Sequence, residues 1–172
     1  VAAATFFDCF NEPHRQCRAT AGKFRETHVL PHLDDWEEAC EVPRDLYKKA
    51  GDAGLLGIGL PEALGGIGEG DIFLKVAVSE ELMRSTSGGL VAGLGSLDIG
   101  LPPVAKWAKK EVREQIVPPV LRGEKIDALA VTEPGGGSDG ANLKTRAVRD
   151  GDHDIANGNK TLVNRGMRAD HH

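Results

Sequence analysis

The chain has 172 residues, of which 40% are hydrophobic and 27% are charged, proportions that are ordinary for a globular protein of one or two domains. Its formal net charge of −5 argues against nucleic acid as a partner, because proteins that bind nucleic acid usually present a basic face. No apolar run approaches the roughly 20 residues of a membrane span, and the opening residues 1–7 are too short for a signal peptide, so we expect a cytoplasmic protein.

The first part of the chain carries a helical pattern. Positions spaced by three and four residues form one face of a first predicted helix: Phe10, His14, Cys17, Ala21, Phe24 and His28. Pro31 is expected to end this helix, because the residue before a proline disfavours the helical conformation. Pro43 is expected to open a second helix, and Gly54 is expected to close it.

Further helical segments are predicted before the pattern changes. Asp71 is a suitable cap for a helix whose first residues, 72–78, are apolar on nearly every side, so we expect that helix to be central. Residues 88–101 are rich in glycine, alanine, serine and leucine, and the prolines at 102–103 are expected to begin another helical piece. Residues 109–121 predict a basic, amphipathic helix at the surface.

After Gly123 the pattern changes from helical to β. The apolar run at 126–131 predicts a strand that leads into a glycine-rich turn. Turn signals at Asp150-Gly151 and Asn157-Gly158, between segments of alternating polarity, then predict a three-stranded meander. Its strands are expected at about 143–149, 152–156 and 160–164.

The glycine-rich turn has two interpretations. Gly135, Gly137 and Gly140 match G-x-G-x-x-G, which would suggest a dinucleotide-binding crossover if a helix opened directly from the turn. The residues that follow alternate with a period of two, as Leu143 and Thr145 illustrate, and this period is typical of a strand. The sequence therefore favours a strand–turn–strand arrangement over the crossover.

The predicted fold class is α+β. An N-terminal all-α helical bundle domain is expected in residues 1–125, followed by the first strands of an incomplete β-barrel-like domain in residues 126–172. Four short strands with no further partner leave open sheet edges. We therefore expect the chain to be a fragment of a longer protein.

No metal site is predicted. Cys9, Cys17 and Cys40 are odd in number and have no metal-like spacing, which favours reduced thiols. His28 and His32 are four residues apart, but the intervening proline is expected to break the helix that would bring them together.

Several motifs together resemble the acyl-CoA dehydrogenase family, in the family's order, from about Phe10 to Asp170. The most specific is V-T-E-P-G-G-G-S-D at Val131–Asp139. The others are the segment Arg44–Gly66, the Ser79–Leu82 helix motif, Asn157–Lys160 and Gly166–Asp170.

The resemblance implies an FAD-dependent enzyme with an N-terminal helical domain, a middle β-domain and a C-terminal helical domain, assembled as a homotetramer. Such enzymes carry out α,β-dehydrogenation of acyl-CoA thioesters. A glutamate removes the α-proton, the β-hydride passes to flavin N5, and an electron-transfer flavoprotein accepts the electrons. The catalytic glutamate belongs to the C-terminal helical domain, which is absent from this chain. No catalytic residue is therefore assigned, and the chain alone is expected to be inactive.

The resemblance also implies which residues contact FAD. Leu129 would border the flavin ring, and Val131 and Thr132 would offer backbone groups and a hydroxyl to its pyrimidine edge. Gly137 and Ser138 form the turn, where Ser138 would bond the FAD pyrophosphate and lie near the substrate's CoA entrance.

The last predicted contacts depart from the family pattern. Leu162 stands where the family usually has an aromatic residue packed on the flavin, and Asn164 replaces the Thr or Ser that approaches flavin N5. Arg165 replaces an asparagine. Residues 90–101 resemble the segment that lines the acyl-chain pocket.

Other interpretations stay open. Glu80 and Glu81 could act as general bases, but ion-paired helix carboxylates are favoured. The same motifs fit an acyl-CoA oxidase or another flavoenzyme of the superfamily. A non-catalytic remnant or helical interaction module is the alternative from a different class.

Overall fold

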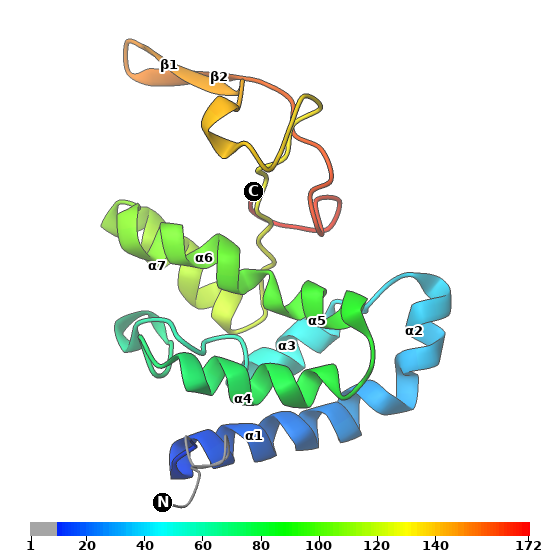
Figure 1. Ribbon diagram of the computed structural model, residues 1–172. Coiled ribbons are helices and arrows are strands. Elements are labelled where there is room, and N and C mark those ends of the chain that lie inside the picture. Colours follow the sequence, from blue (N-terminus) through cyan, green and yellow to red (C-terminus); the bar gives the residue numbers. More distant parts are fainter. Residues whose placement is uncertain (1–9) are drawn as a thin grey trace, which may run out of the picture.

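The computed structural model describes residues 10–172 and shows a helical part followed by a small β part, as the predicted α+β class requires (Figure 1). The helices are α1 (Glu12–Phe24), α2 (Leu33–Ala39), α3 (Asp45–Asp52), α4 (Ile72–Met83), α5 (Gly88–Gly95), α6 (Leu97–Trp107) and α7 (Lys110–Leu121). The strands are β1 (Arg146–Asp150) and β2 (His153–Asn157). The predictions for Cys9 and for residues 1–7 lie outside the described residues, whereas Cys17 and Cys40 are free thiols.

The prediction that Pro31 ends the first helical run is wrong. After α1 the chain continues as a π-helical turn at Arg25–Val29 and a 3₁₀ turn at Leu30–His32, and then enters α2. Pro31 lies at the start of the 3₁₀ turn, where a missing backbone N–H leaves no helical hydrogen bond unmade. The change in helix type absorbs the proline without reversing the chain.

One carboxylate joins the beginnings of α1 and α4. The Asn11 side chain accepts the backbone N–H of His14, and His14 Nδ1 accepts the backbone N–H of Asn11. His14 Nε2 therefore carries the ring proton and donates it to Asp71 Oδ2 at 2.8 Å. Asp71 caps α4, as predicted, by accepting the backbone N–H of Phe73. The hydrogen bond from His14 lowers the pKa of Asp71.

Helices α1 and α4 pack along their lengths (Figure 1), and a buried ion pair joins the π-helical turn that follows α1 to α4. Arg25 Nη1 donates to Glu81 Oε2 at 2.9 Å and to the Glu81 carbonyl oxygen, and both side chains are buried. Arg84 also contacts Glu81, and Arg18 contacts Glu80. The ion-paired interpretation of Glu80 and Glu81 is thus the one that the structure shows.

The helical core gathers side chains from most of the bundle. Its largest fully buried members are Val29, Leu46, Leu90, Leu101, Val117, Val120 and Ile126. Each such side chain contributes about 2 kcal/mol of hydrophobic stabilisation. Helix α4 packs between α1 and α5, as its apolar sequence predicted, although Ile72 and Phe73 at its start are exposed.

The prolines at 102 and 103 lie inside α6, which corrects the expectation that they begin a helix. Each removes one hydrogen bond to a carbonyl four residues earlier, on Asp98 or Ile99. Asp98 and Ile99 are exposed, so water can satisfy the carbonyls that lose their partners.

Helices α5 and α6 together form an apolar segment, Gly88–Trp107, that could span a membrane by length and composition alone. The expectation that no segment has this character is therefore wrong. The leucines that make the segment apolar, Leu90, Leu94, Leu97 and Leu101, are buried in the helical core. A helix in the core of a globular protein can be equally long and apolar, so length and composition do not show that this segment crosses a membrane.

Backbone atoms approach closely where α3 meets the turn after α7. Gly123 has φ of +66°, and a Cβ on it would overlap the carbonyl oxygen of Tyr47. A Cβ on Gly51 would overlap the backbone of Arg122. Gly123 therefore ends the helical half, as predicted, and also sets the distance between α3 and α7.

The β part is smaller than predicted. Strands β1 and β2 pair in antiparallel register, with Val148 opposite Ile155, across the predicted turn at Asp150-Gly151. Both strands are exposed throughout and extend away from the helices (Figure 1). Residues 126–131 form no regular strand and have a single parallel bridge, between Asp127 and His171.

The third predicted strand, at 160–164, is absent from the described β part. Leu162 and Arg165 have φ of +53° and +62°, values that an extended strand excludes. The Thr161 backbone N–H instead bonds the carbonyl of Thr132, 29 residues earlier. Tertiary hydrogen bonds thus replace the local hairpin that the sequence pattern favoured.

Asp170 ties the end of the described chain to the helical part. Its carboxylate accepts the backbone N–H of Ile126 at 2.9 Å and contacts the side chains of Arg44 and Lys125. Burial raises the pKa of Asp170, but the hydrogen bonds from Ile126 and Arg44 outweigh that effect and hold the pKa at about 2.

We expect Gly123→Ala to lower the free energy of unfolding by about 3 kcal/mol or more, because it adds a clash with Tyr47 to an unfavourable φ. Gly151→Ala is the matched control: Gly151 has φ of +59°, but its Cβ would meet nothing. The control should cost only about 1 kcal/mol. Urea unfolding measures the free energy of unfolding of both variants. Equal decreases for Gly123→Ala and Gly151→Ala would contradict the role of the close backbone approach.

Asp170→Asn is expected to destabilise the fold by about 1 kcal/mol at pH 7, a value already reduced for solvent screening. The pKa of Asp170 in the folded state is about 2, below the ordinary value of 3.8. Its contribution to the free energy of unfolding is therefore complete above pH 3.8 and is lost as the pH falls towards 2. The wild-type and variant unfolding free energies should therefore converge over this range. A difference that stays constant down to pH 2 would refute the assignment.

Candidate functional site

A buried glutamate organises the glycine-rich turn. The backbones of Glu133 and Gly136 exchange two hydrogen bonds, of 2.9 and 3.1 Å, which closes the turn. The Glu133 carboxylate is buried and accepts the backbone N–H groups of Lys144 and Thr145 at 2.6 and 2.9 Å. The turn is thereby fastened to the chain that leads into β1.

Lys160 completes this arrangement. Its ammonium donates to Glu133 Oε1 and to the Val131 carbonyl oxygen, both at 2.9 Å. The Thr145 side chain, the Lys144 backbone N–H and the Lys160 ammonium lower the pKa of Glu133 to about 2. Glu133 is thus ionised at neutral pH and acts as an acceptor for this cluster rather than as a proton carrier.

A groove of about 590 Å³ lies between the helices and the segments that follow them. Its helical wall is formed mainly by small and apolar residues: Gly88, Val91, Ala92, Gly95, Ser96 and Ile99, with Ser79 and Asp98. Leu129, Leu162 and Asn164 line the groove from the other side. The structure therefore brings together three of the residues that the sequence assigned to FAD.

The remaining predicted residues lie outside the groove lining, on the neighbouring turn. Val131 and Thr132 lie two and three residues after Leu129, and their carbonyls accept the bonds from Lys160 and Thr161. Gly137 lies against Thr132, since a Cβ on Gly137 would be 3.2 Å from the Thr132 side chain. Ser138 is exposed. These four residues surround one turn, at the end of the segment that Leu129 begins.

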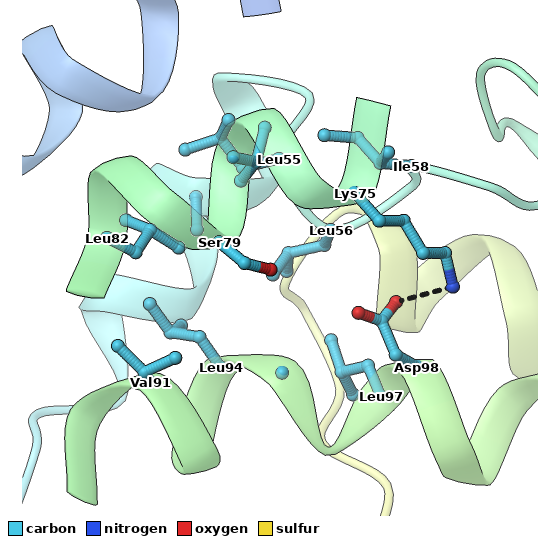
Figure 2. Close-up of a pocket in the computed structure, with 13 residues that line it drawn as sticks. Leu55, Leu56, Ile58, Lys75, Ser79, Leu82, Val91, Leu94, Leu97 and Asp98 are labelled. Carbon is cyan, nitrogen blue, oxygen red and sulfur yellow. Dashed lines mark hydrogen bonds and ion pairs between the residues drawn. The ribbon is translucent and has the colours of Figure 1, made fainter. Parts of the chain in front are cut away.

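Figure 2 shows a smaller apolar cavity of about 50 Å³, which shares part of its lining with the groove. Aliphatic side chains from the segment after α3 and from α4, α5 and α6 form most of its wall. Lys75 and Asp98 form an ion pair of 3.2 Å at one side (Figure 2). The residues that line both the cavity and the groove are Ser79, Val91, Gly95 and Asp98. The apolar wall of the groove thus continues into the helical core.

The loop at 162–165 is fixed to the helices. Asn164 Nδ2 donates to the Ala92 carbonyl oxygen at 3.2 Å, and Arg165 donates to the Ser96 hydroxyl. These bonds reach α5 and the residue that joins α5 to α6. Asn164 therefore lies at the groove because its loop bonds the helical wall directly.

Sequence reasoning missed the residues that hold these segments in place. Glu133 lies within the most specific motif, but its position next to the turn did not reveal its contacts with residues 144–145. Asp127 lies in a segment predicted as a strand, and Arg165 directly follows another. Nothing in the sequence indicated that these two charged side chains are buried. Within residues 10–172, no group of three side chains is placed to hold a metal ion.

The comparisons with known proteins agree with the fold. The sequence model of the family described as "Acyl-CoA dehydrogenase, N-terminal domain" matches residues 11–124. The mitochondrial long-chain specific acyl-CoA dehydrogenase of Rattus norvegicus is 40% identical over 161 residues, which cover 94% of this chain and 37% of the rat protein.

Solved structures are also similar. The acyl-CoA dehydrogenase of Geobacillus kaustophilus is 38% identical with a TM-score of 0.83, over 94% of this chain and 42% of that protein. A glutaryl-CoA dehydrogenase of Mycobacterium smegmatis, solved in complex with FADH2, is 27% identical with a TM-score of 0.86, over 96% of this chain and 42% of that protein. The chain thus spans about two-fifths of the length of these relatives, and it belongs to the acyl-CoA dehydrogenase family.

Proposed function

We propose that the groove between α5, α6 and the segments at 129 and 162–164 forms part of a site for FAD and an acyl-CoA thioester. The chain would supply the helical wall and the first cofactor contacts of an enzyme that carries out α,β-dehydrogenation. An electron-transfer flavoprotein as electron acceptor and a homo-oligomeric assembly belong to the same proposal, on the strength of the family.

The observation that carries the proposal is the composition of the two groove walls. A flavin ring has apolar faces and a polar edge, and Leu129, Leu162 and Asn164 offer two apolar side chains and one amide. The opposite wall, on α5 and α6, has small and aliphatic side chains that suit a hydrocarbon chain. Apolar walls with a few polar groups are typical of cofactor sites.

The chain's own residues would act by binding and orientation. Leu129 and Leu162 would pack against the cofactor and exclude water from it, and Asn164 would present its side-chain carbonyl while its Nδ2 bonds Ala92. The turn held by Glu133 would place the Thr132 and Ser138 hydroxyls. FAD, when bound, supplies the acceptor for the hydride.

The catalytic base is not assigned to any described residue. Asp98 is the carboxylate that lines the groove within residues 10–172, and it is ion-paired with Lys75. Glu80 and Glu81 are held by arginines on the other side of α4. We propose that proton removal belongs to another part of the enzyme.

FAD binding tests the proposal. Leu162 is 87% exposed, so Leu162→Asp should leave the fold unchanged while placing a charge against the flavin. We expect the wild-type chain to bind FAD and the variant to bind it at least about tenfold more weakly, in a titration that follows flavin fluorescence. Met167→Asp is the control, because Met167 is 99% exposed and lies outside the groove lining. A wild-type chain without FAD affinity would overturn the proposal.

Acyl-CoA binding tests the helical wall separately. Gly95 lines the groove and its Cβ would meet nothing, so Gly95→Leu can fold while filling the groove. Gly89 lies on the same helix with the same open space but outside the groove lining, which makes Gly89→Leu the control. Calorimetry with octanoyl-CoA and FAD should show at least about tenfold weaker binding for Gly95→Leu alone. Equal affinities would place the acyl chain elsewhere.

A further inference from the structure

The loop that carries Leu162 and Asn164 adopts a conformation that its sequence alone would not favour. Leu162 and Arg165 both have left-handed backbone angles, and neither is a glycine. Each such residue costs about 1 kcal/mol or more, so surrounding contacts must hold the loop. The contacts that could do so come from Asn164 and Arg165.

Arg165 is the stronger of the two anchors. Its side chain is only 6% exposed, and its Nη2 donates to the hydroxyl of Ser96. Its guanidinium carbon lies 5.5 Å from the centre of the Tyr47 ring, a distance typical of a cation–π contact. The single side chain thereby joins the loop to α3 and to the start of α6.

Asp127 provides the opposing charge. Its Oδ1 lies 3.9 Å from Arg165 Nη2, and its carboxylate packs against the backbone of α6 at Gly100, where a Cβ would overlap it. Burial raises the pKa of Asp127, and the positive charge of Arg165 opposes that shift. The pair is therefore mutually dependent, since either charge alone would be buried without compensation.

The pair is poorly arranged for stability. Within residues 10–172, Asp127 Oδ1 and the Nε and Nη1 atoms of Arg165 are buried without a hydrogen-bond partner. Such atoms cost stability, and apolar residues of similar volume often stabilise a site of this kind better than a buried ion pair does. Buried polar groups that are only partly satisfied are concentrated at functional sites.

We propose that Arg165 is a positioning residue, which with Asp127 holds the 162–165 loop so that Leu162 and Asn164 face the groove. This role rests on the proposed function of the groove. It acts through Asn164: the bond from Arg165 to Ser96 and the bond from Asn164 to Ala92 fix the loop at adjacent residues. Without the first bond, the loop can leave its left-handed conformation and the second bond is lost.

The experiment compares variants of the full chain. Arg165→Met removes the anchor but leaves Asp127 buried and uncompensated, so it can unfold the protein. The double variant Asp127→Asn with Arg165→Met removes both charges and should fold. Arg168→Met is the matched control: Arg168 lies on the same segment, but it bonds the Val42 carbonyl oxygen and Glu41 rather than Ser96.

The first measurement is hydrogen exchange of the Asn164 side-chain amide, followed by NMR. We expect at least about tenfold faster exchange in the double variant and no change in Arg168→Met, although both lose a guanidinium. Wild-type exchange rates in a folded double variant would overturn the proposal. This measurement needs no FAD, so it decides the role of Arg165 even if the wild-type chain fails to bind the cofactor.

The second measurement is the affinity for FAD. A positioning role predicts at least about tenfold weaker FAD binding in the double variant and unchanged binding in Arg168→Met. The comparison requires that the double variant and the wild type have equal melting temperatures. Faster Asn164 exchange with unchanged FAD affinity would overturn the link between the loop and the cofactor. A wild-type chain that binds no FAD would instead count against the proposed function.

Discussion

The backbones of α3 and of the turn after α7 lie closer together than any side chain would permit. Gly51 and Gly123 are the residues that allow this approach, and Gly123 also supplies the left-handed angle that ends α7. The direction in which the chain leaves the helical part is set at this point. Ile126 and Asp127 follow within four residues, so both are placed against the helices by the same contact. Everything that the chain builds afterwards starts from that position.

Two ionic clusters serve different purposes in the molecule. Arg25 and Glu81 connect the π-helical turn after α1 to α4 inside the helical part, where direct hydrogen bonds satisfy the carboxylate. The contacts of Asp170 and Arg165 cross from the C-terminal segment to the helices, and they hold a part that has little apolar surface to bury. The exposed hairpin shows how small that apolar contribution is. Polar contacts therefore position the groove, while the hydrophobic core positions the helices.

Features that depend on a few neighbouring residues could be predicted from the sequence. The cap at Asp71, the turn at Asp150-Gly151 and the end of α7 at Gly123 each follow from local chemistry. The predictions failed where contacts with residues far away in the sequence determine the local conformation. Residues 160–164 read as a strand, yet Lys160 and Thr161 bond residues 131–133 instead. No local pattern encodes a partner that lies about 30 residues away.

The residues of the candidate site likewise fall into those that the sequence could indicate and those that it could not. Motif resemblance pointed to Leu129, Leu162 and Asn164 through their positions relative to neighbouring motifs, although Leu162 and Asn164 depart from the family's residue types. The structure places the three side chains on one groove. Motif resemblance could not find Arg165 or Asp127 as supports, since their burial depends on α3 and α6. The roles in binding FAD stay predictions for the three groove residues and equally for Val131, Thr132, Gly137 and Ser138. Charged residues in apolar surroundings are the class that sequence reasoning reads least well.

The shared carboxylate of Asp71 has a consequence for how the helical part loosens. It accepts the ring proton of His14 at the beginning of α1 and the backbone N–H of Phe73 at the beginning of α4. Fraying of either first turn removes a partner from the other, so the two ends open as one cooperative unit rather than independently. Two helix beginnings separated by about sixty residues of chain thus share a single local unfolding event.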